Sequence, residues 1–262
     1  MTEWNAASYA RQSALQKWLA DECLAQLELA GAERVLDIGC GDGKITAGIA
    51  ARLRSGSVLG IDPSTHMIDF ARTQFARSQA NLTFDVGDAR TLAFHDAFDL
   101  IVSFNALHWV PDQRAALRGI RAALTPAGRA VLQFVPQGER KSLEDVLEEV
   151  RTAARWARSF TAYTRPFFHP TAEEYAAAAA DSGLRIERVD IEPKAWDFGS
   201  RDAFIAFARV TFVEWTRVLP SESQLPFIHD VLDAYHALAD GSAADAEVFH
   251  FYQMRVTLRR AD

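Results

Sequence analysis

The sequence contains few cysteines and no long hydrophobic run. Its two cysteines, Cys23 and Cys40, cannot form a disulfide framework, and neither belongs to a C-x-x-C pair. The histidines show no metal-ligand spacing, so no metal is expected. No uninterrupted apolar stretch reaches the roughly 18 residues of a membrane-spanning helix, and the first residues lack a signal-peptide core. These absences predict a soluble cytoplasmic protein that does not act at a membrane.

An excess of positive charge is also missing. The 28 basic residues are outnumbered by 35 acidic ones, giving a net charge of −7, which argues against a nucleic-acid partner. No G-x-S-x-G motif is present, so a serine hydrolase of that type is not expected. With 49% hydrophobic and 24% charged residues among 262, the composition is that of an ordered globular protein.

The first half of the chain alternates short apolar runs with amphipathic stretches. The apolar runs predict strands at Arg34–Ile38, Ser57–Ile61, Leu82–Val86, Phe98–Phe104 and Arg129–Val135. Helical patterns separate these runs, which indicates βαβ units and therefore a parallel sheet with helices on both faces. The runs at 35–38 and 100–102 are apolar in succession, as burial on both faces requires.

The sequence pattern changes after Pro136, and the helical patterns that follow are rich in aromatic residues. We expect helices at Ala7–Leu29, Ser142–Arg158, Thr171–Ser182, Phe204–Leu219 and Phe227–Leu238, and strands at Leu184–Ile191 and Val248–Leu258. No repeat or linker divides the chain. Residues 1–262 are therefore interpreted as one α/β domain: a core at 30–136, an N-terminal helix at 1–29, and insertions at 137–247 that form a substrate cap.

A glycine-rich loop follows the first predicted strand and precedes a helix. Asp37-x-Gly39-x-Gly41-x-Gly43 fits the acidic-x-G-x-G-x-G pattern of proteins that bind S-adenosylmethionine (SAM). A dinucleotide fingerprint would need its third glycine at the position of Lys44, which counts against NAD or FAD. Such loops let the backbone approach a ligand closely at the carboxyl edge of a parallel sheet.

Two further acidic residues follow the next two predicted strands. Asp62 ends the second strand, where a carboxylate can accept both hydroxyls of a ribose. Asp88 lies in Gly87-Asp88-Ala89 after the third strand, where it can accept a hydrogen bond from an adenine amino group. Three sites at three successive strand ends predict an adenosyl ligand.

Residues 34–136 resemble the class I (Rossmann-like) SAM-dependent methyltransferases. VLDIGCGDG, GIDPS, VGDA, FDLIVSFNALHWV and LTPAGRAVLQF appear in family order. The resemblance implies a seven-stranded, mostly parallel sheet with an antiparallel last strand, SAM as methyl donor and S-adenosylhomocysteine as product. It also implies that the cofactor-binding residues are Asp37, Gly39, Cys40, Gly41, Asp62, Pro63, Met67, Asp88, Ala89 and Asn105. Among these, the backbone of Asn105 would meet the amino group of SAM.

Within that class, Leu107-His108-Trp109 is similar to the trans-aconitate and juvenile hormone acid O-methyltransferases, which esterify small carboxylic acids. The segment around Gln16 is similar to the start of the juvenile hormone acid enzymes. The resemblance implies that Gln16 and Trp109 hold the acceptor carboxylate. Gln16 also fits an exposed helical position and Trp109 an aromatic plug at a strand end. His108 can be a base, a hydrogen-bond donor or a packing residue.

More than half of the aromatic residues lie after residue 150. A pocket beneath so aromatic a cap favours a hydrophobic acid over a tricarboxylate. A tricarboxylate would call for convergent arginines, for which Arg11, Arg165 and Arg217 are available. The acidic run Glu144-Asp145 with Glu148-Glu149 is expected to form a water-facing helix surface.

The sequence therefore predicts a methyltransferase that transfers the methyl group of SAM to a small molecule, with the carboxylate of a hydrophobic acid as acceptor. N- or C-methylation of a secondary metabolite with His108 as base is the alternative. A noncatalytic SAM-binding protein is a third reading, and a nicotinamide oxidoreductase is disfavoured by Lys44. A monomer or a homodimer is expected.

Overall fold

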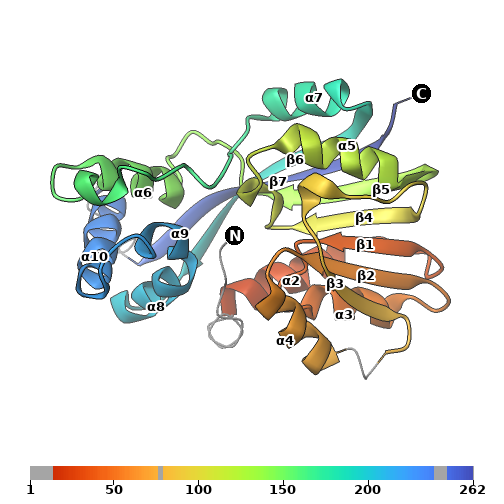
Figure 1. The fold of residues 1–262 in the computed structure, drawn as a ribbon, viewed down its shortest axis with the longest axis horizontal. Helices are drawn as coiled ribbons and strands as arrows, with labels where there is room; N and C mark the ends of the chain where they lie inside the picture. The colour runs from red at the N-terminus through yellow and green to blue at the C-terminus, as the bar shows by residue number, and fades with distance from the viewer. Residues whose placement is uncertain (1–13, 76–78, 239–246, 262) are drawn as a thin grey trace.

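The computed structural model describes residues 14–75, 79–238 and 247–261. Its centre is a seven-stranded sheet with the order β3-β2-β1-β4-β5-β7-β6 (Figure 1). The strands are β1 (Arg34–Ile38), β2 (Ser57–Asp62), β3 (Leu82–Val86), β4 (Phe98–Phe104), β5 (Leu124–Phe134), β6 (Leu184–Asp197) and β7 (Val248–Arg260). Strands β1 to β5 pair in parallel, whereas β7 runs antiparallel to both of its neighbours. The predicted sheet is confirmed.

Strand β6 continues to Asp197, beyond the predicted end at Ile191. Pro193 lies within it, opposite Tyr252 of β7. Proline cannot donate to a sheet ladder, but β6 is the edge strand and pairs on one side only. The strand predicted from the sequence was too short, because the sequence could not show that this strand lies at the edge of the sheet, where proline is tolerated.

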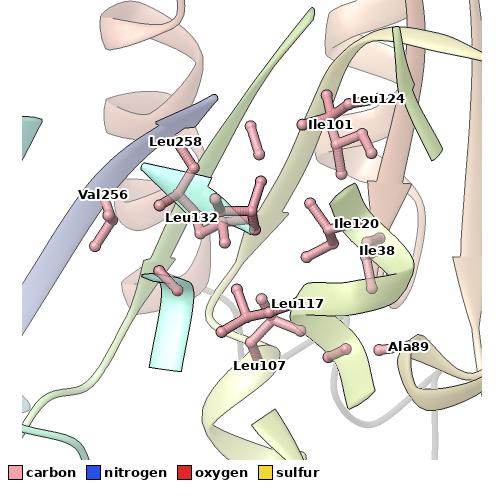
Figure 2. Close-up of a cluster of buried hydrophobic side chains, with 14 of the residues drawn as sticks. Ile38, Ala89, Ile101, Leu107, Leu117, Ile120, Leu124, Leu132, Val256 and Leu258 are labelled. Atoms are coloured by element: carbon pink, nitrogen blue, oxygen red, sulfur yellow. The ribbon is translucent and has the colours of Figure 1, made fainter. Parts of the chain in front are cut away.

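Helices cover both faces of the sheet (Figure 1). One face packs against α2 (Ala14–Gln26), α3 (Lys44–Arg52) and α4 (Thr65–Phe75). The other packs against α5 (Gln113–Ala123) and α7 (Ala172–Asp181), and Figure 2 shows side chains of α5 against those of the central strands. Part of the helix expected at Ala7–Leu29 precedes residue 14 and lies outside the described residues.

The central strands are buried on both faces, as their uninterrupted apolar runs predicted. In β1, Val35 packs into the hydrophobic cluster beneath α3, and its neighbour Leu36 into the cluster beneath α5. In β4, Leu100 and Ile101 divide between the same two clusters. All four side chains are 1% exposed or less. This double burial is what a parallel sheet between two helix layers requires.

Apart from α7, the α-helices after β5 gather at one end of the molecule, and the long strands β6 and β7 extend toward them (Figure 1). They are α6 (Leu143–Thr152), α8 (Arg201–Thr211), α9 (Val213–Thr216) and α10 (Ser221–Ala237). Together with the ends of the long strands they enclose a hydrophobic cluster rich in aromatic rings. We call this region the cap.

The helix predicted over Phe204–Leu219 is wrong in one respect, because it divides into α8 and α9 at Phe212. The break leaves both Phe212 and Trp215 nearly inaccessible to solvent in the core of the cap. Helix α7 begins and ends as its sequence predicts: Thr171 and Glu174 form a capping box, and Gly183 follows with a φ of 73°. Within the ranges described, no helix has the length and apolar character to cross a bilayer.

Candidate active site

A cavity of about 560 Å³ lies at the carboxyl edge of the sheet and continues into the cap. This is the edge at which open α/β sheets bind ligands. The residues that line it from the strand ends include Gly39, Gly41, Asp62, Asp88, Ala89, Asn105, His108 and Trp109. Those that line it from the cap include Leu143, Glu144, Leu147, Phe207, Phe212, Glu214, Trp215 and Phe251.

The glycine loop is held to the second strand by backbone hydrogen bonds. The N–H groups of Gly39 and Cys40 donate to the carbonyl of Ile61 at 2.8 and 3.0 Å. Gly39 has a φ of 74°, and a β-carbon there would lie 2.2 Å from the β-carbon of Ala106. Gly41 has a φ of 53° and open space where a side chain would project. The loop therefore needs glycine both for its conformation and for its close packing.

Asp62 lies at the end of β2, beside this loop. Its carboxylate accepts a hydrogen bond from the N–H of Gly41 at 3.1 Å and another from the N–H of Ser64 at 2.9 Å. The side chain is therefore fixed at the cavity wall, next to the glycine backbone. The predicted neighbours Cys40, Pro63 and Met67 also line the cavity.

Asp88 and Ala89 follow β3 and line the same cavity. Asp88 caps a short 3-10 helix, accepting from the N–H of Arg90 at 2.9 Å, and the Arg90 side chain also pairs with it. The hydrogen bonds from Arg90 lower the pKa of the Asp88 carboxyl, against a smaller opposing effect of burial. Asp88 is therefore ionised, and its contacts with Arg90 fix the orientation of its side chain.

Asp37 differs from the other predicted cofactor residues, because it is 2% exposed and does not line the cavity. Its Oδ2 accepts a hydrogen bond from the hydroxyl of Thr46 at 2.6 Å, which ties the end of β1 to helix α3. Burial raises the pKa of Asp37 to about 7, the Thr46 hydrogen bond opposes this rise, and the charge of Asp62 adds to it. Asp37 therefore lies beneath the loop and outside the cavity lining, and a role for it in cofactor binding stays a prediction.

Asn105 lines the cavity just past β4 and has the left-handed φ of 56°, which asparagine tolerates better than most residues. Its N–H donates to the carbonyl of Gln133 at 2.7 Å, and its Oδ1 accepts from Nε2 of Gln253 at 3.0 Å. Gln253 is a buried polar residue of β7. Sequence analysis missed its role, because β7 also contains histidine, threonine and arginine and a glutamine among them gives no local signal.

His108 and Trp109 lie on a 3-10 turn between β4 and α5, and both line the cavity. The Trp109 ring meets Trp215 edge-on at 6.1 Å between ring centres, and Phe167 at 6.3 Å. His108 is 4% exposed, and its Nδ1 has no hydrogen-bond partner among the described residues. Burial, and secondarily His169, lowers the pKa of His108 well below 6.5, so the ring is neutral and weakly basic.

Gln16 falls on helix α2, but its side chain lies outside the described part of the structure. Its neighbours Leu15, Leu19 and Ala20 line the cavity. Helix α2 therefore contributes to the site, and a role for Gln16 stays a prediction.

The acidic run on α6 corrects the sequence analysis. Glu149 is exposed as expected, whereas Glu144 lines the cavity and the Glu148 side chain is only 16% exposed. Glu148 accepts from the indole N–H of Trp215 at 2.8 Å and the hydroxyl of Tyr163 at 3.2 Å, and pairs with Arg151 at 2.6 Å. Glu144 and Glu148 face inward because the aromatic cap folds over that side of the helix, which helical periodicity alone could not reveal.

Of the three arginines available to bind a tricarboxylate, two lie among the described residues, and both pair with acidic side chains. Arg165 lies over the ring of Phe167 and pairs with Asp145 at 3.4 Å, and Arg217 pairs with Glu214 at 2.8 Å. Neither arginine lines the cavity. The third, Arg11, lies outside the described residues. The described part of the site therefore shows no convergence of arginines.

Comparisons with known proteins agree with this geometry. Residues 35–128 match the family described as a methyltransferase domain. A trans-aconitate 2-methyltransferase from Variovorax paradoxus is 35% identical over 158 residues, which is 60% of this chain and 59% of the relative. Another from Delftia acidovorans is 27% identical over 92% of this chain and 94% of its own length.

Solved structures resemble the fold. The YcgJ protein from Bacillus subtilis has a TM-score of 0.67 at 17% identity, covering 94% of this chain and 99% of its own. A phosphoethanolamine N-methyltransferase 2 from Haemonchus contortus, in complex with S-adenosylmethionine, has a TM-score of 0.56 at 19% identity, covering 97% of this chain and 56% of its own. These likenesses identify the class I methyltransferase fold.

The matched domain, the relatives and the fold all support a SAM-dependent methyltransferase. Among such enzymes, the chain resembles the trans-aconitate methyltransferase group. The residues present fit the donor: the open space at Gly41 leaves room for a ligand against the backbone, and the Asp62 carboxylate stands beside it.

Replacing Asp62 by alanine is expected to weaken SAM binding at least tenfold, or about 1.4 kcal/mol, because the ribose loses an anionic acceptor and Gly41 loses its anchor. Isothermal titration calorimetry with SAM measures this directly. The control is Asp69→Ala on helix α4, whose side chain is 68% exposed. Equal affinities for the two variants would remove Asp62 from the binding site.

Proposed function

We propose that the chain methylates the carboxylate of a small hydrophobic acid and produces its methyl ester. The proposal is supported chiefly by one observation: a single cavity joins the glycine loop to an aromatic wall, with Trp109 between them. Similarity to trans-aconitate 2-methyltransferases supports a carboxylate as the acceptor group. In this proposal residues 1–262 act as one domain, with 30–136 binding SAM and 137–247 capping the acceptor.

When bound, SAM supplies a methyl group on a positively charged sulfur, so the acceptor oxygen forms the new bond to carbon while the carbon–sulfur electron pair stays on sulfur. A carboxylate is already ionised at neutral pH, because carboxyl pKa values lie near 4. The chain then needs no base. Its residues bind the two molecules, orient the acceptor and exclude water.

The cofactor roles follow from the positions along the cavity. In the proposal Gly39 and Gly41 adjoin the methionine part of SAM, Asp62 accepts the ribose hydroxyls, and Asp88 with Ala89 holds the adenine. The backbone of Asn105 meets the amino group. Each of these residues lines the cavity, at four successive strand ends.

The alternative of N- or C-methylation with His108 as base finds little support in the site. Burial lowers the pKa of His108 well below 6.5, which weakens the ring as a proton acceptor at neutral pH. The ring packs beside Trp109 and His169, with ring centres 5.2 and 5.9 Å away. We assign His108 a packing role beside the acceptor.

The cap favours an acceptor with an apolar body. Leu143, Leu147, Phe212 and Trp215 lie in the wall, while Arg165 and Arg217 do not line the cavity and each pairs with an acidic side chain. Burying three carboxylates against such a wall without cationic partners is costly. We therefore propose a hydrophobic acid as acceptor, in contrast to the tricarboxylate named for the relatives.

Incubation with SAM labelled in its methyl group tests the proposal. The acceptors are a panel of aliphatic and isoprenoid acids, with amines and phenols of the same chain lengths as controls. We expect label in an ester that alkali hydrolyses. Label only in amines, phenols or carbon atoms would contradict the carboxylate assignment. SAM binding without turnover on any acceptor would instead favour a noncatalytic protein.

A further inference from the structure

The acceptor part of the cavity has an unusual charge distribution for a site that takes an acid. Among the described residues, its charged side chains on the cap side are Glu144 and Glu214. The basic side chains that line the cavity, Lys44 and Arg90, lie at its cofactor end and pair with Asp42 and Asp88. An acid in this cavity therefore needs a hydrogen-bond donor other than a lysine or an arginine.

The two cap carboxylates differ in their surroundings. Glu214 pairs with Arg217 at 2.8 Å, so its charge is compensated. No basic side chain of the described residues forms an ion pair with Glu144, since Arg165, the basic residue beside it, pairs with Asp145. Glu144 lies on the first turn of α6 between Leu143 and Leu147, both buried and both in the cavity wall.

These surroundings favour the neutral form of Glu144. Glu144 is half-buried, and desolvation raises its pKa to about 7. A hydrogen bond from its own backbone N–H is the largest opposing effect, the neighbouring charge of Asp145 adds to the rise, and the Ser142 hydroxyl and Arg165 also oppose it. The other groups that face it are Tyr235 of α10, over whose ring Arg140 lies, and Glu214 across the cavity. A carboxyl group kept neutral by an apolar site can donate a hydrogen bond, which a carboxylate cannot.

We propose that Glu144 binds the acceptor, and that its protonated carboxyl donates a hydrogen bond to one carboxylate oxygen of the acid. The other oxygen of the acid is then left to take the methyl group. The inference rests on the proposed function and deepens it, because it assigns a hydrogen-bond donor from the cap in addition to Gln16 and Trp109, which the resemblance implies.

The test compares Glu144→Gln and Glu144→Ala with the unchanged protein, using decanoate as the acceptor between about pH 6 and pH 8.5. Decanoate stays ionised throughout, because carboxyl pKa values lie near 4. Glutamine keeps an N–H donor at every pH, whereas alanine has none. Glu149→Gln, on the exposed side of the same helix, is the matched control.

For the unchanged protein and the control, we expect kcat/KM to fall by about tenfold as the pH rises through the pKa of the donor. Glu144→Gln should show a flat profile, and Glu144→Ala a low one at every pH. Calorimetry should show the same pattern in the affinity with which decanoate binds the protein loaded with S-adenosylhomocysteine. The affinity of the protein for S-adenosylhomocysteine itself should stay unchanged.

A flat profile for the unchanged protein, with decanoate still methylated, would overturn the role of Glu144 and leave the carboxylate acceptor intact. A rate that rises with pH and disappears in Glu144→Gln would show that Glu144 removes a proton instead, and would also overturn it. Failure to bind or methylate any acid would refute the proposed function, and the assignment of Glu144 with it.

Discussion

Replacing Gly39 by alanine is expected to weaken SAM binding at least a hundredfold, or about 2.7 kcal/mol. The new β-carbon would lie 2.2 Å from that of Ala106, a distance at which one of the two backbone segments must move. Both segments line the cavity, so the movement displaces the binding surface itself. The φ of 74° adds strain, because residues that have a side chain rarely adopt that backbone conformation.

Alanine substitutions at two further glycines distinguish the effect of backbone strain from that of the steric contact with Ala106. Gly199→Ala, with a φ of 70° and open space around it, should cost about 1 kcal/mol of unfolding free energy through strain alone and leave SAM binding unchanged. Gly41→Ala should cost a similar unfolding free energy but also weaken SAM binding, because its methyl group would project into open space in the cavity wall.

Thermal unfolding and calorimetry with S-adenosylhomocysteine measure both quantities, and circular dichroism shows whether each variant is folded. If the Gly39→Ala variant binds S-adenosylhomocysteine as tightly as the Gly199→Ala variant does, the contact with Ala106 does not shape the binding site. If Gly41→Ala binds normally, the ligand does not approach that part of the loop.

Replacing Glu148 by alanine is expected to lower the unfolding free energy by about 2 kcal/mol, because three polar groups in the cap lose their common partner. The indole N–H of Trp215, the hydroxyl of Tyr163 and the guanidinium of Arg151 all bond to this carboxylate. Trp215 is 0% exposed and lines the cavity, so its ring should lose its fixed orientation. We therefore also expect a higher KM for the acceptor, with SAM affinity unchanged.

Urea unfolding and steady-state kinetics test this second prediction. The control is Glu149→Ala, which removes an exposed ion pair with Lys141 and should cost no more than about 0.5 kcal/mol. Equal losses of unfolding free energy in the two variants would show that Glu148 does not hold the cap together.

Much of the sheet and the donor site could be read from the sequence. The strands were predicted because a strand buried on both faces is continuously apolar, and β1 and β4 are such strands. The glycine loop was predicted from its three alternate glycines between a strand and a helix, and Gly39 and Gly41 do adopt conformations that few other residues tolerate. Asp62 was predicted because the carboxyl ends of parallel strands meet at one edge of the sheet.

The acceptor side could be predicted only in part. Trp109 lines the cavity as expected, but Glu144 and Glu148 were interpreted as water-facing. The helical period of α6 identifies two faces without saying which one another segment will cover. Gln253, which bonds to Asn105, carried no local signal at all.

The chain order of apolar runs, glycines and acidic strand ends determined the class of fold and predicted where the methyl donor would bind, because these features depend on neighbours close in sequence. Tertiary structure alone decided which carboxylates became buried. Glu148 meets Trp215 and Asn105 meets Gln253 only after segments far apart in the chain have packed together. Hydrogen bonds of this kind depend on desolvation by distant residues, which no local pattern encodes.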